Sequence, residues 1–211
     1  MKSLLQAVSL AIIFALLAMF SYPVFEPTQA LAVTDNVDVT LTVDSGISIT
    51  DASNTSMSPN ISISNDTSTG STAWTVITND NAGYTLSVKA TTTPAMHNGT
   101  DSFADYSEAV SGTPDAWSVD SGNYEFGYSA YGTDTPTGTW GSGGSCGSGD
   151  PGATSMNYVG FSTSDKQVAS RSTVTPYAGL ATTVCFGAEQ NTVFAPSGVY
   201  VATIVATAVV Q

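Results

Sequence analysis

The feature that most constrains the fold of this 211-residue chain is a period-two alternation of apolar and polar residues. In the first such run Val37, Val39, Leu41 and Val43 alternate with Asp38, Thr40 and Thr42. Successive side chains of a strand point to opposite faces of a sheet, so this pattern predicts a half-buried strand. Similar runs recur to the end of the sequence, and helical periodicity is absent after residue 33. The body of the chain is therefore predicted to consist of strands.

Further strands are predicted wherever the alternation returns. They are expected around Ile47 and Ile49, Ile61 and Ile63, Trp74 and Val76, residues 84–88, residues 126–130 and residues 184–188. The turn-forming residues 79–83 separate two of these runs and predict a hairpin. The last run, residues 198–211, is apolar on both faces, which is typical of a central or doubly covered strand.

About eight to ten short strands separated by turn residues indicate a sandwich or a barrel. We predict an all-β fold, an antiparallel β-sandwich that is Ig-like or jelly-roll-like, in a single domain over residues 33–211. The longest loop is expected at residues 132–154, which are rich in Gly and Ser. Loops of this length often carry function on a rigid scaffold.

The N-terminus has the pattern of a cleaved export signal. Lys2 supplies a positive charge, residues 4–20 are almost wholly apolar, and Ala30-Leu31-Ala32 forms an A-x-A cleavage site. We expect residues 1–32 to be a signal peptide, with cleavage before Val33. The alternative is an uncleaved anchor, although an apolar run of about 17 residues is near the lower limit for a spanning helix.

The charge of the chain excludes several classes of partner. Seventeen acidic residues face only four basic ones, for a net charge of -13. Such a chain cannot neutralise a phosphate backbone, so nucleic acid is excluded as a partner, and docking on anionic lipid is disfavoured. A single His and two Cys rule out most zinc sites.

The two cysteines, Cys146 and Cys185, both follow the predicted cleavage site. In an oxidising compartment they are expected to form a disulfide. Cys146 lies in the Gly/Ser-rich loop and Cys185 in a strand-like run, so the bond would staple the loop to a sheet. A redox role has no support, because the chain has no CxxC spacing.

Several carboxylates are candidates for catalysis. Asp-Ser-Gly occurs twice, at Asp44 and Asp120, and aspartic proteases place two close carboxylates in such turns. A turn at the end of a strand is the simpler interpretation of both. Glycoside hydrolysis would use two of Glu108, Glu125 and Glu189, together with the Asp residues. His97 is the only imidazole, and no cluster of catalytic residues is evident in the sequence, so we predict that the protein is not an enzyme.

No cofactor is predicted, with calcium left open as an alternative. Oxygen ligands are offered by two short groups, Asp35-Asn36-Asp38 and Asn65-Asp66-Thr67. Neither group has the spacing of an EF-hand, and a solvated acidic face explains both.

An aromatic-rich stretch offers candidate contacts for carbohydrate. It contains Trp117, Tyr124, Tyr128, Tyr131 and Trp140. Exposed aromatic rings stack on the apolar faces of sugars, and Trp117, Tyr131 and Trp140 are the candidates for this role. The alternative is that these rings form the core and rim of the sandwich.

Three segments resemble the WxL-type cell-wall-binding domains of Gram-positive surface proteins. Residues 198–204 look like the strand that closes those domains, and Trp74-Thr75-Val76 and Trp117-Ser118-Val119 resemble the Trp-x-Leu signature with Val in place of Leu. The resemblance implies an exported β-sandwich that binds envelope polysaccharide or partner surface proteins.

These observations lead us to expect a secreted, non-enzymatic structural or adhesive protein associated with the cell surface or envelope. Its expected partners are envelope polysaccharide or other surface proteins, with self-association left open, and no membrane span is expected after cleavage. One alternative is a fibre subunit, in which residues 37–43 complete the sheet of a neighbouring copy. A second alternative is a secreted carbohydrate-active enzyme.

Overall fold

The computed structural model describes residue 9, residues 11–16, residues 34–50 and residues 52–211. The chain forms two units, Met1–Thr42 and Val43–Gln211. In the first unit residues 9 and 11–16 are helical, and residues 34–42 form neither helix nor strand. The predicted cleavage site and most of the predicted signal peptide lie outside the described residues. In the part of the chain that the structure describes, no helix is both long and apolar enough to cross a membrane.

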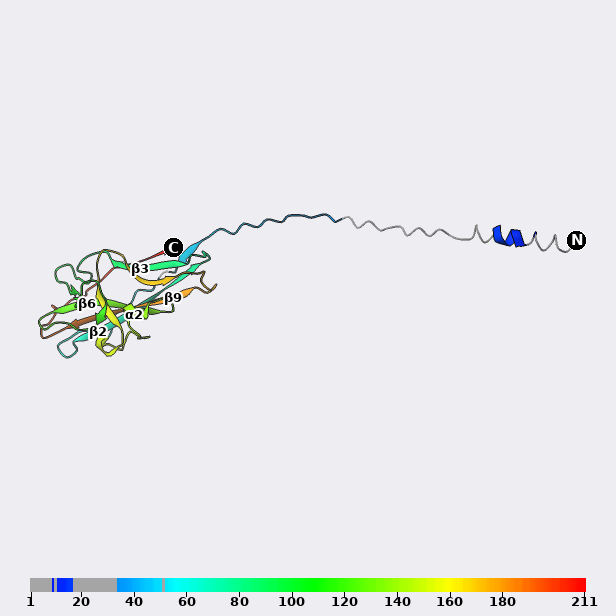
Figure 1. Cartoon of the computed structure of the whole chain (residues 1–211). Coiled ribbons are helices and arrows are strands. Elements are labelled where there is room, and N and C mark those ends of the chain that lie inside the picture. The colour runs from blue at the N-terminus through cyan, green and yellow to red at the C-terminus, as the bar shows by residue number, and fades with distance from the viewer. Residues whose placement is uncertain (1–8, 10, 17–33, 51) are drawn as a thin grey trace. The chain divides into compact units, whose positions relative to one another are not determined.

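The second unit is a β-sandwich of two sheets, as predicted (Figure 1). The larger sheet has the order β1 (Ile47–Ile49), β2 (Thr67–Thr78), β9 (Leu180–Gln190), β6 (Tyr124–Gly132), β7 (Asn157–Gly160) and β5 (Asp115–Ala116). β4 (Ala104–Asp105) pairs with β6 and is the one parallel neighbour among these strands. The smaller sheet has the order β10 (Ile204–Val210), β3 (Tyr84–Ala90) and β8 (Lys166–Arg171).

The main core lies between the two sheets. β3 contributes Tyr84, Leu86 and Val88, all with no exposed surface, because its alternate residues face the larger sheet. β6 and β9 supply facing rings and methyl groups, among them Phe126 and Phe186, whose ring centroids lie 6.1 Å apart. The strong sequence alternation in these three strands therefore corresponds to their buried faces.

The opposite face of the larger sheet is covered by loops. Gly127 of β6 lies between Gly160 of β7 and Gly187 of β9 in register. These three glycines form a trough against which Tyr106 and Trp117 pack, with their rings stacked 4.6 Å apart. A Cβ atom at Gly127 would lie 2.7 Å from the Cβ of Tyr106, so close approach of the aromatic residues explains glycine inside a strand.

Two sequence predictions within the body are wrong. β2 and β3 were expected to pair as a hairpin, but they lie in different sheets, and residues 79–83 carry the chain across the sandwich. Ile61 and Ile63 were expected in a strand, but residues 62–65 form a turn closed by backbone hydrogen bonds between Ser62 and Asn65. Short apolar alternation was misleading there because Ile63 points into solvent.

The long loop at residues 132–154 contains two short helical segments. α2 (Thr137–Trp140) buries Trp140 against Tyr128, and the 3-10 turn η1 (Pro151–Ala153) begins after Asp150. The Asp150 side chain accepts a hydrogen bond from the Gly152 N–H and so caps this turn.

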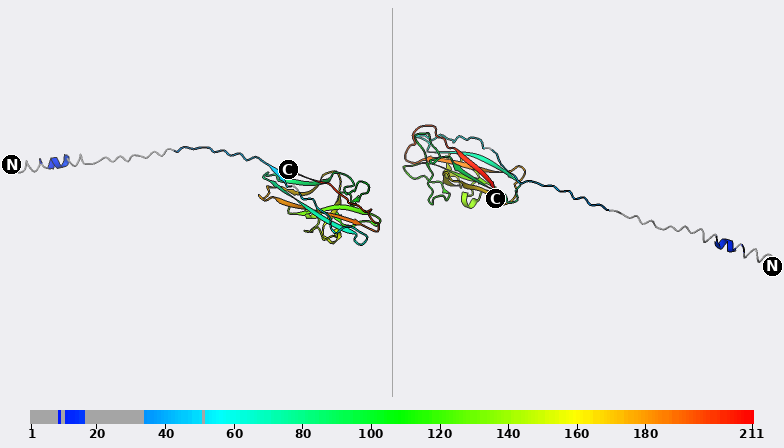
Figure 2. Two further views of the ribbon diagram at one scale, coloured as in Figure 1. Left: turned by 180° about the vertical axis from the view of Figure 1, so that it is seen from behind. Right: turned by 90° about the horizontal axis from the view of Figure 1, so that it is seen from above.

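The two ends of the body differ most from the sequence prediction. Residues 37–43 were predicted to be a strand, but residues 34–46 contain no strand. The final run was predicted to be a central or doubly covered strand, but β10 is an edge strand of the smaller sheet, drawn in red in Figure 2. In both segments the sequence pattern predicts pairing with a neighbouring strand, and the structure shows less pairing than predicted.

Candidate functional site

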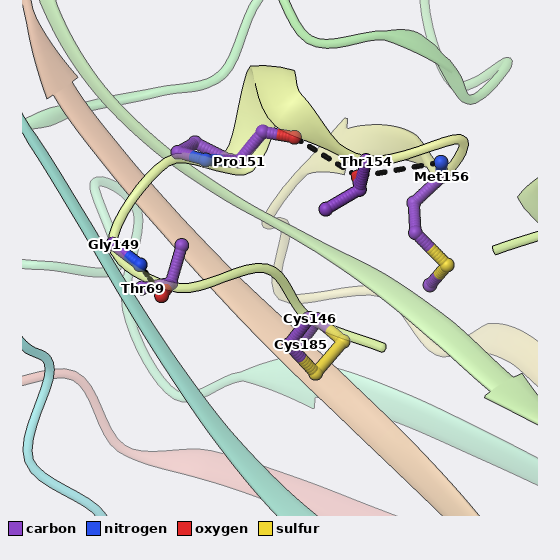
Figure 3. The surroundings of a disulfide bond; sticks show 7 residues. All are labelled: Thr69, Cys146, Gly149, Pro151, Thr154, Met156 and Cys185. Atoms are coloured by element: carbon purple, nitrogen blue, oxygen red, sulfur yellow. Dashed lines mark hydrogen bonds between the residues drawn. A yellow bond between two sulfur atoms is a disulfide. The ribbon is translucent and has the colours of Figure 1, made fainter. Parts of the chain in front are cut away.

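The predicted disulfide between Cys146 and Cys185 is present (Figure 3). It joins the Gly/Ser-rich loop to β9, with the two Cα atoms 5.1 Å apart. The Gly149 N–H donates to Thr69 Oγ1 at 2.8 Å, so the same loop is also held to β2. A segment with little conformational preference of its own is therefore fixed against the sheet at two points.

An open depression of about 360 Å³ lies beside this disulfide. It is lined by residues of β2, by Pro59 with its neighbours, and by residues 146–149. The lining contains no charged and no aromatic side chain. It therefore offers neither a catalytic acid or base nor a ring that stacks on a sugar.

The three candidate carbohydrate contacts do not form one surface. Trp140 is fully buried in the main core, so its ring offers no face to a ligand, which corrects the prediction. Trp117 and Tyr131 are half-buried and belong to a second cluster, around the disulfide. The Trp117 Nε1–H donates to Glu189 Oε2 at 2.6 Å, which holds the indole over the glycine trough.

The candidate catalytic glutamates hold loops in place. Glu108 accepts from the backbone N–H groups of Gly160 and Gly112, and Glu125 accepts from the Ser107 N–H at 3.1 Å. Glu125 and Glu189 lie opposite each other in β6 and β9. Burial raises the pKa of both carboxyl groups, and hydrogen bonds from Ser107 and Trp117 oppose that shift.

The two Asp-Ser-Gly motifs lie at opposite ends of the sandwich. The Asp44 carbonyl accepts from Asn79, just beyond the last residue of β2, whereas Asp120 precedes β6 at the end where β2 begins. Twelve residues of β2 separate these ends, a distance of roughly 36 Å at the rise of a strand. The two carboxylates therefore cannot share a proton, and Asp44 and Asp120 do not form the dyad of an aspartic protease.

The structure gives no support for a calcium site within the residues it describes, which contain no group of three or more His, Cys, Asp or Glu placed to hold a metal ion. Asp35, Asn36 and Asp38 are all exposed in the extended segment. The Asn65 side-chain amide donates to the carbonyls of Asn60 and Thr67, so it serves the turn.

The exposed segment before β1 is the first half of the site that remains. The side chains of Val37, Val39, Leu41 and Val43 are between 74% and 89% exposed. All four would lie on one face of a strand, with Asp38, Thr40 and Thr42 on the other. The segment thus carries a complete strand pattern, yet it pairs with none of the strands that the structure describes.

Asn79 anchors the base of this segment. Its side chain accepts from the Gly46 N–H at 2.7 Å and donates to the Asp44 carbonyl at 2.8 Å. The Gly46 carbonyl also accepts from Thr78 Oγ1 at 2.8 Å. The chain therefore enters β1 through a fixed point at the turn of residues 79–83.

The free edge of β10 is the second half of the site. β10 pairs with β3 without interruption over seven residues, from Ile204 to Val210. In the described part of the chain, no backbone group of these residues bonds to any other strand. β10 contains no charge, no Pro and no bulge, which are the usual protections of an exposed edge.

The other edge of the smaller sheet is protected. β8 has a register shift against β3, and it begins with Lys166 and ends with Arg171. The Ser170 N–H donates to the Asp134 carbonyl at 3.0 Å, so a loop already occupies part of this edge. Of the two edges, only β10 offers a long, uncharged row of backbone groups.

In comparisons with known proteins, no family model matches this chain, and neither a curated protein nor a solved structure matches it. The sequence pointed to residues 37–43 as a donated strand, but it gave no sign of the Asn79 anchor, which depends on contacts across 35 positions. It also missed the edge position of β10, because apolar residues on both faces are typical of a central strand.

Proposed function

We propose that this chain is a non-enzymatic structural protein of a cell surface, and that it is the subunit of an extracellular fibre assembled by strand exchange. The exposed apolar row of residues 37–43 carries the proposal. Water disfavours such a row, and burial against a sheet of another chain removes it from water. An extended segment that adds to an edge also satisfies the backbone groups of both partners.

The disulfide and the N-terminal pattern support an extracellular location. Disulfides persist in oxidising compartments and are rare in the cytosol. Cys146 and Cys185 are bonded, and no other cysteine exists in the chain. The predicted cleavage before Val33 would leave residues 33–43 as an arm ahead of the anchor at Asn79.

The contacts of the candidate catalytic residues support a structural role. Glu108, Glu125 and Glu189 each accept a hydrogen bond that holds a loop or an indole ring. The backbone of His97 pairs with Val201, and its side chain is exposed. A sugar-binding role receives less support, because the three candidate aromatic residues are dispersed between two clusters.

The proposal is tested by following assembly of the purified chain from residue 33 to residue 211. We expect filaments in electron micrographs above a threshold concentration. The double variant Val39→Ser/Leu41→Ser removes apolar surface from the buried face of the donated strand and should abolish filaments. Thr40→Ser/Thr42→Ser changes the same number of residues on the opposite face, at the same net charge, and should preserve them.

A strict monomer at every concentration would contradict the proposal. Equal assembly of the two double variants would also contradict it, since the apolar face would then have no part in the contact. The melting temperatures of both variants should match that of the parent chain when measured below the threshold, because residues 37–43 are exposed in the single chain.

A further inference from the structure

Two segments of the single chain lack a neighbouring strand, and each could serve as the neighbour of the other. Residues 37–43 have a strand pattern without a sheet, and β10 has two apolar faces at an edge. We propose that residues 37–43 of one copy add to the free edge of β10 in a second copy, as a fourth strand of the smaller sheet. This inference rests on the proposed function and names the acceptor.

The donated strand and its acceptor match in length and in face. Both span seven residues, and β10 alternates between half-buried and exposed side chains. When Thr40 lies beside Thr207 on the solvent side, Val39 and Leu41 lie on the same face of the sheet as Ala206. That face of β10 points to the core. A slip of one residue would turn every apolar side chain of the donor outward, so the pattern itself selects the register.

The inner row of β10 is left incompletely covered in the single chain. Ile204, Ala206 and Ala208 pack against the core but remain half-buried, whereas Leu86 and Val88 of the neighbouring β3 have no exposed surface. β1 approaches β10 at this margin of the sandwich, but it is only three residues long. An added strand would bury these side chains further, because the larger sheet does not cover them completely.

Charge does not decide between the two sheets. Within residues 43–211 all three basic side chains lie on the smaller sheet, Lys89 on β3 and Lys166 and Arg171 on β8. Lys89 and Arg171 already pair with Asp165 and Asp134, and neither β3 nor β8 borders the free edge of β10. The match in strand pattern, length and face therefore carries the choice of acceptor.

The anchor at Asn79 favours a second copy over the same chain. β10 ends at the turn of residues 79–83, where the Gln211 N–H donates to the Gly83 carbonyl, and the donor segment is held at this same turn. To lie on its own β10 the segment would have to reverse within residues 44–46. Asn79 holds the Asp44 carbonyl at the site of that reversal, whereas donation to another copy needs no change there.

Donor and acceptor are different surfaces of the chain. A contact of this kind is heterologous, so each copy donates one strand and accepts one strand. Unless the rotation between copies closes a ring, repetition gives an open filament with one unused arm and one unused β10 edge at its ends.

Cysteine crosslinking between differently tagged chains tests the acceptor. One chain carries Thr40→Cys, and the other carries Val205→Cys, Thr207→Cys or Val209→Cys on the solvent side of β10. Neighbouring strands bring Cα atoms about 4.5–5.5 Å apart, within the range of a disulfide. Ser48→Cys on β1 and Gln167→Cys on β8 are the matched controls, because both positions are exposed on the other candidate edges.

We expect mixed-tag crosslinks at one or more of the β10 positions, mapped by peptide mass spectrometry, and none at Ser48 or Gln167. Filaments that crosslink only at Ser48 or Gln167, or at none of the five positions, would overturn the acceptor and leave the proposed function standing. Failure of the parent chain to assemble would overturn both. Crosslinks confined to one chain, tested with Thr40→Cys/Thr207→Cys at high dilution, would show self-completion and overturn the inference.

A synthetic peptide of residues 34–45 gives a second test that needs no cysteine. It should occupy the β10 edge of the full chain and stop filament growth in proportion to its concentration. A peptide of the same composition without the alternation is the control. Equal inhibition by both peptides, or by neither, would contradict insertion of this strand.

Discussion

The glycine trough and the β10 edge differ in how completely their strands are covered. At the trough, three glycines on adjacent strands admit Tyr106 and Trp117, and a disulfide secures a nearby loop. At the edge, a strand with apolar residues on both faces has a neighbour on one side only. The comparison teaches that the chain stabilises its body with close packing and a covalent crosslink, whereas β10 keeps an unpaired edge in the single chain.

Removal of the disulfide should give the largest change in stability. Cys146→Ala/Cys185→Ala opens a loop of 39 positions, which chain-entropy arithmetic equates with about 4 kcal/mol of unfolding free energy. Urea unfolding measures this loss, and Ser145→Ala in the same loop is the control. Filaments should still form wherever the variant is folded, because the disulfide is remote from the β10 edge. Equal unfolding free energies for this variant and the parent would show that the disulfide does not stabilise the body of the chain.

A methyl group in the trough should cost less than the disulfide. In Gly127→Ala the new Cβ would lie 2.7 Å from the Tyr106 Cβ and 2.9 Å from the Val159 carbonyl oxygen. Overpacking of this kind typically costs about 1–3 kcal/mol. Gly138→Ala is the matched control, because its Cβ would meet no atom within 4 Å. Thermal unfolding of the two variants sharpens the comparison, and equal melting temperatures would show that the trough is not tightly packed.

The smallest expected effect is on the pH dependence of stability. Burial raises the pKa of Glu125 above its ordinary value, and the pKa values of Asp105 and Glu189 shift in the same direction. The folded chain therefore binds these protons more tightly than the unfolded chain. Their contribution to stability is complete below the ordinary pKa and is lost as the pH rises through the raised one.

Glu125→Gln should make the free energy of unfolding less dependent on pH between about 4 and 7. Asp35→Asn removes the same charge from the exposed segment and is the charge-matched control. Parallel slopes for Glu125→Gln and the parent would show that this carboxyl group titrates alike in the folded and unfolded chains.

The sequence was sufficient to predict the strands whose alternate residues face the core. β3, β6 and β9 were expected from Leu86, Tyr128 and Phe186, because period-two burial leaves a direct trace in the residue order. Pairing between strands was not predictable in the same way. The turn of residues 79–83 is compatible with a hairpin and with a crossing between sheets, and only the core decides between them.

The candidate site was half predictable for the same reason. The pattern of residues 37–43 predicted a strand that the single chain does not form, and the apolar faces of β10 predicted a central strand where the structure has an edge. Asn79 left no signal, because a single amide that anchors two backbone groups has no periodicity. The partners of the glutamates left no signal either, because Glu108 and Glu125 accept from backbone N–H groups and Glu189 accepts from the distant Trp117 indole.

Amide hydrogen exchange on dilute and assembled chains tests the central claim most directly. In the dilute chain the amides of residues 37–43 and those on the free edge of β10 should exchange rapidly, while those of β3 are protected. In filaments both sets should become protected together. Protection of residues 37–43 in the dilute chain, or filaments in which the β10 edge still exchanges rapidly, would contradict the account.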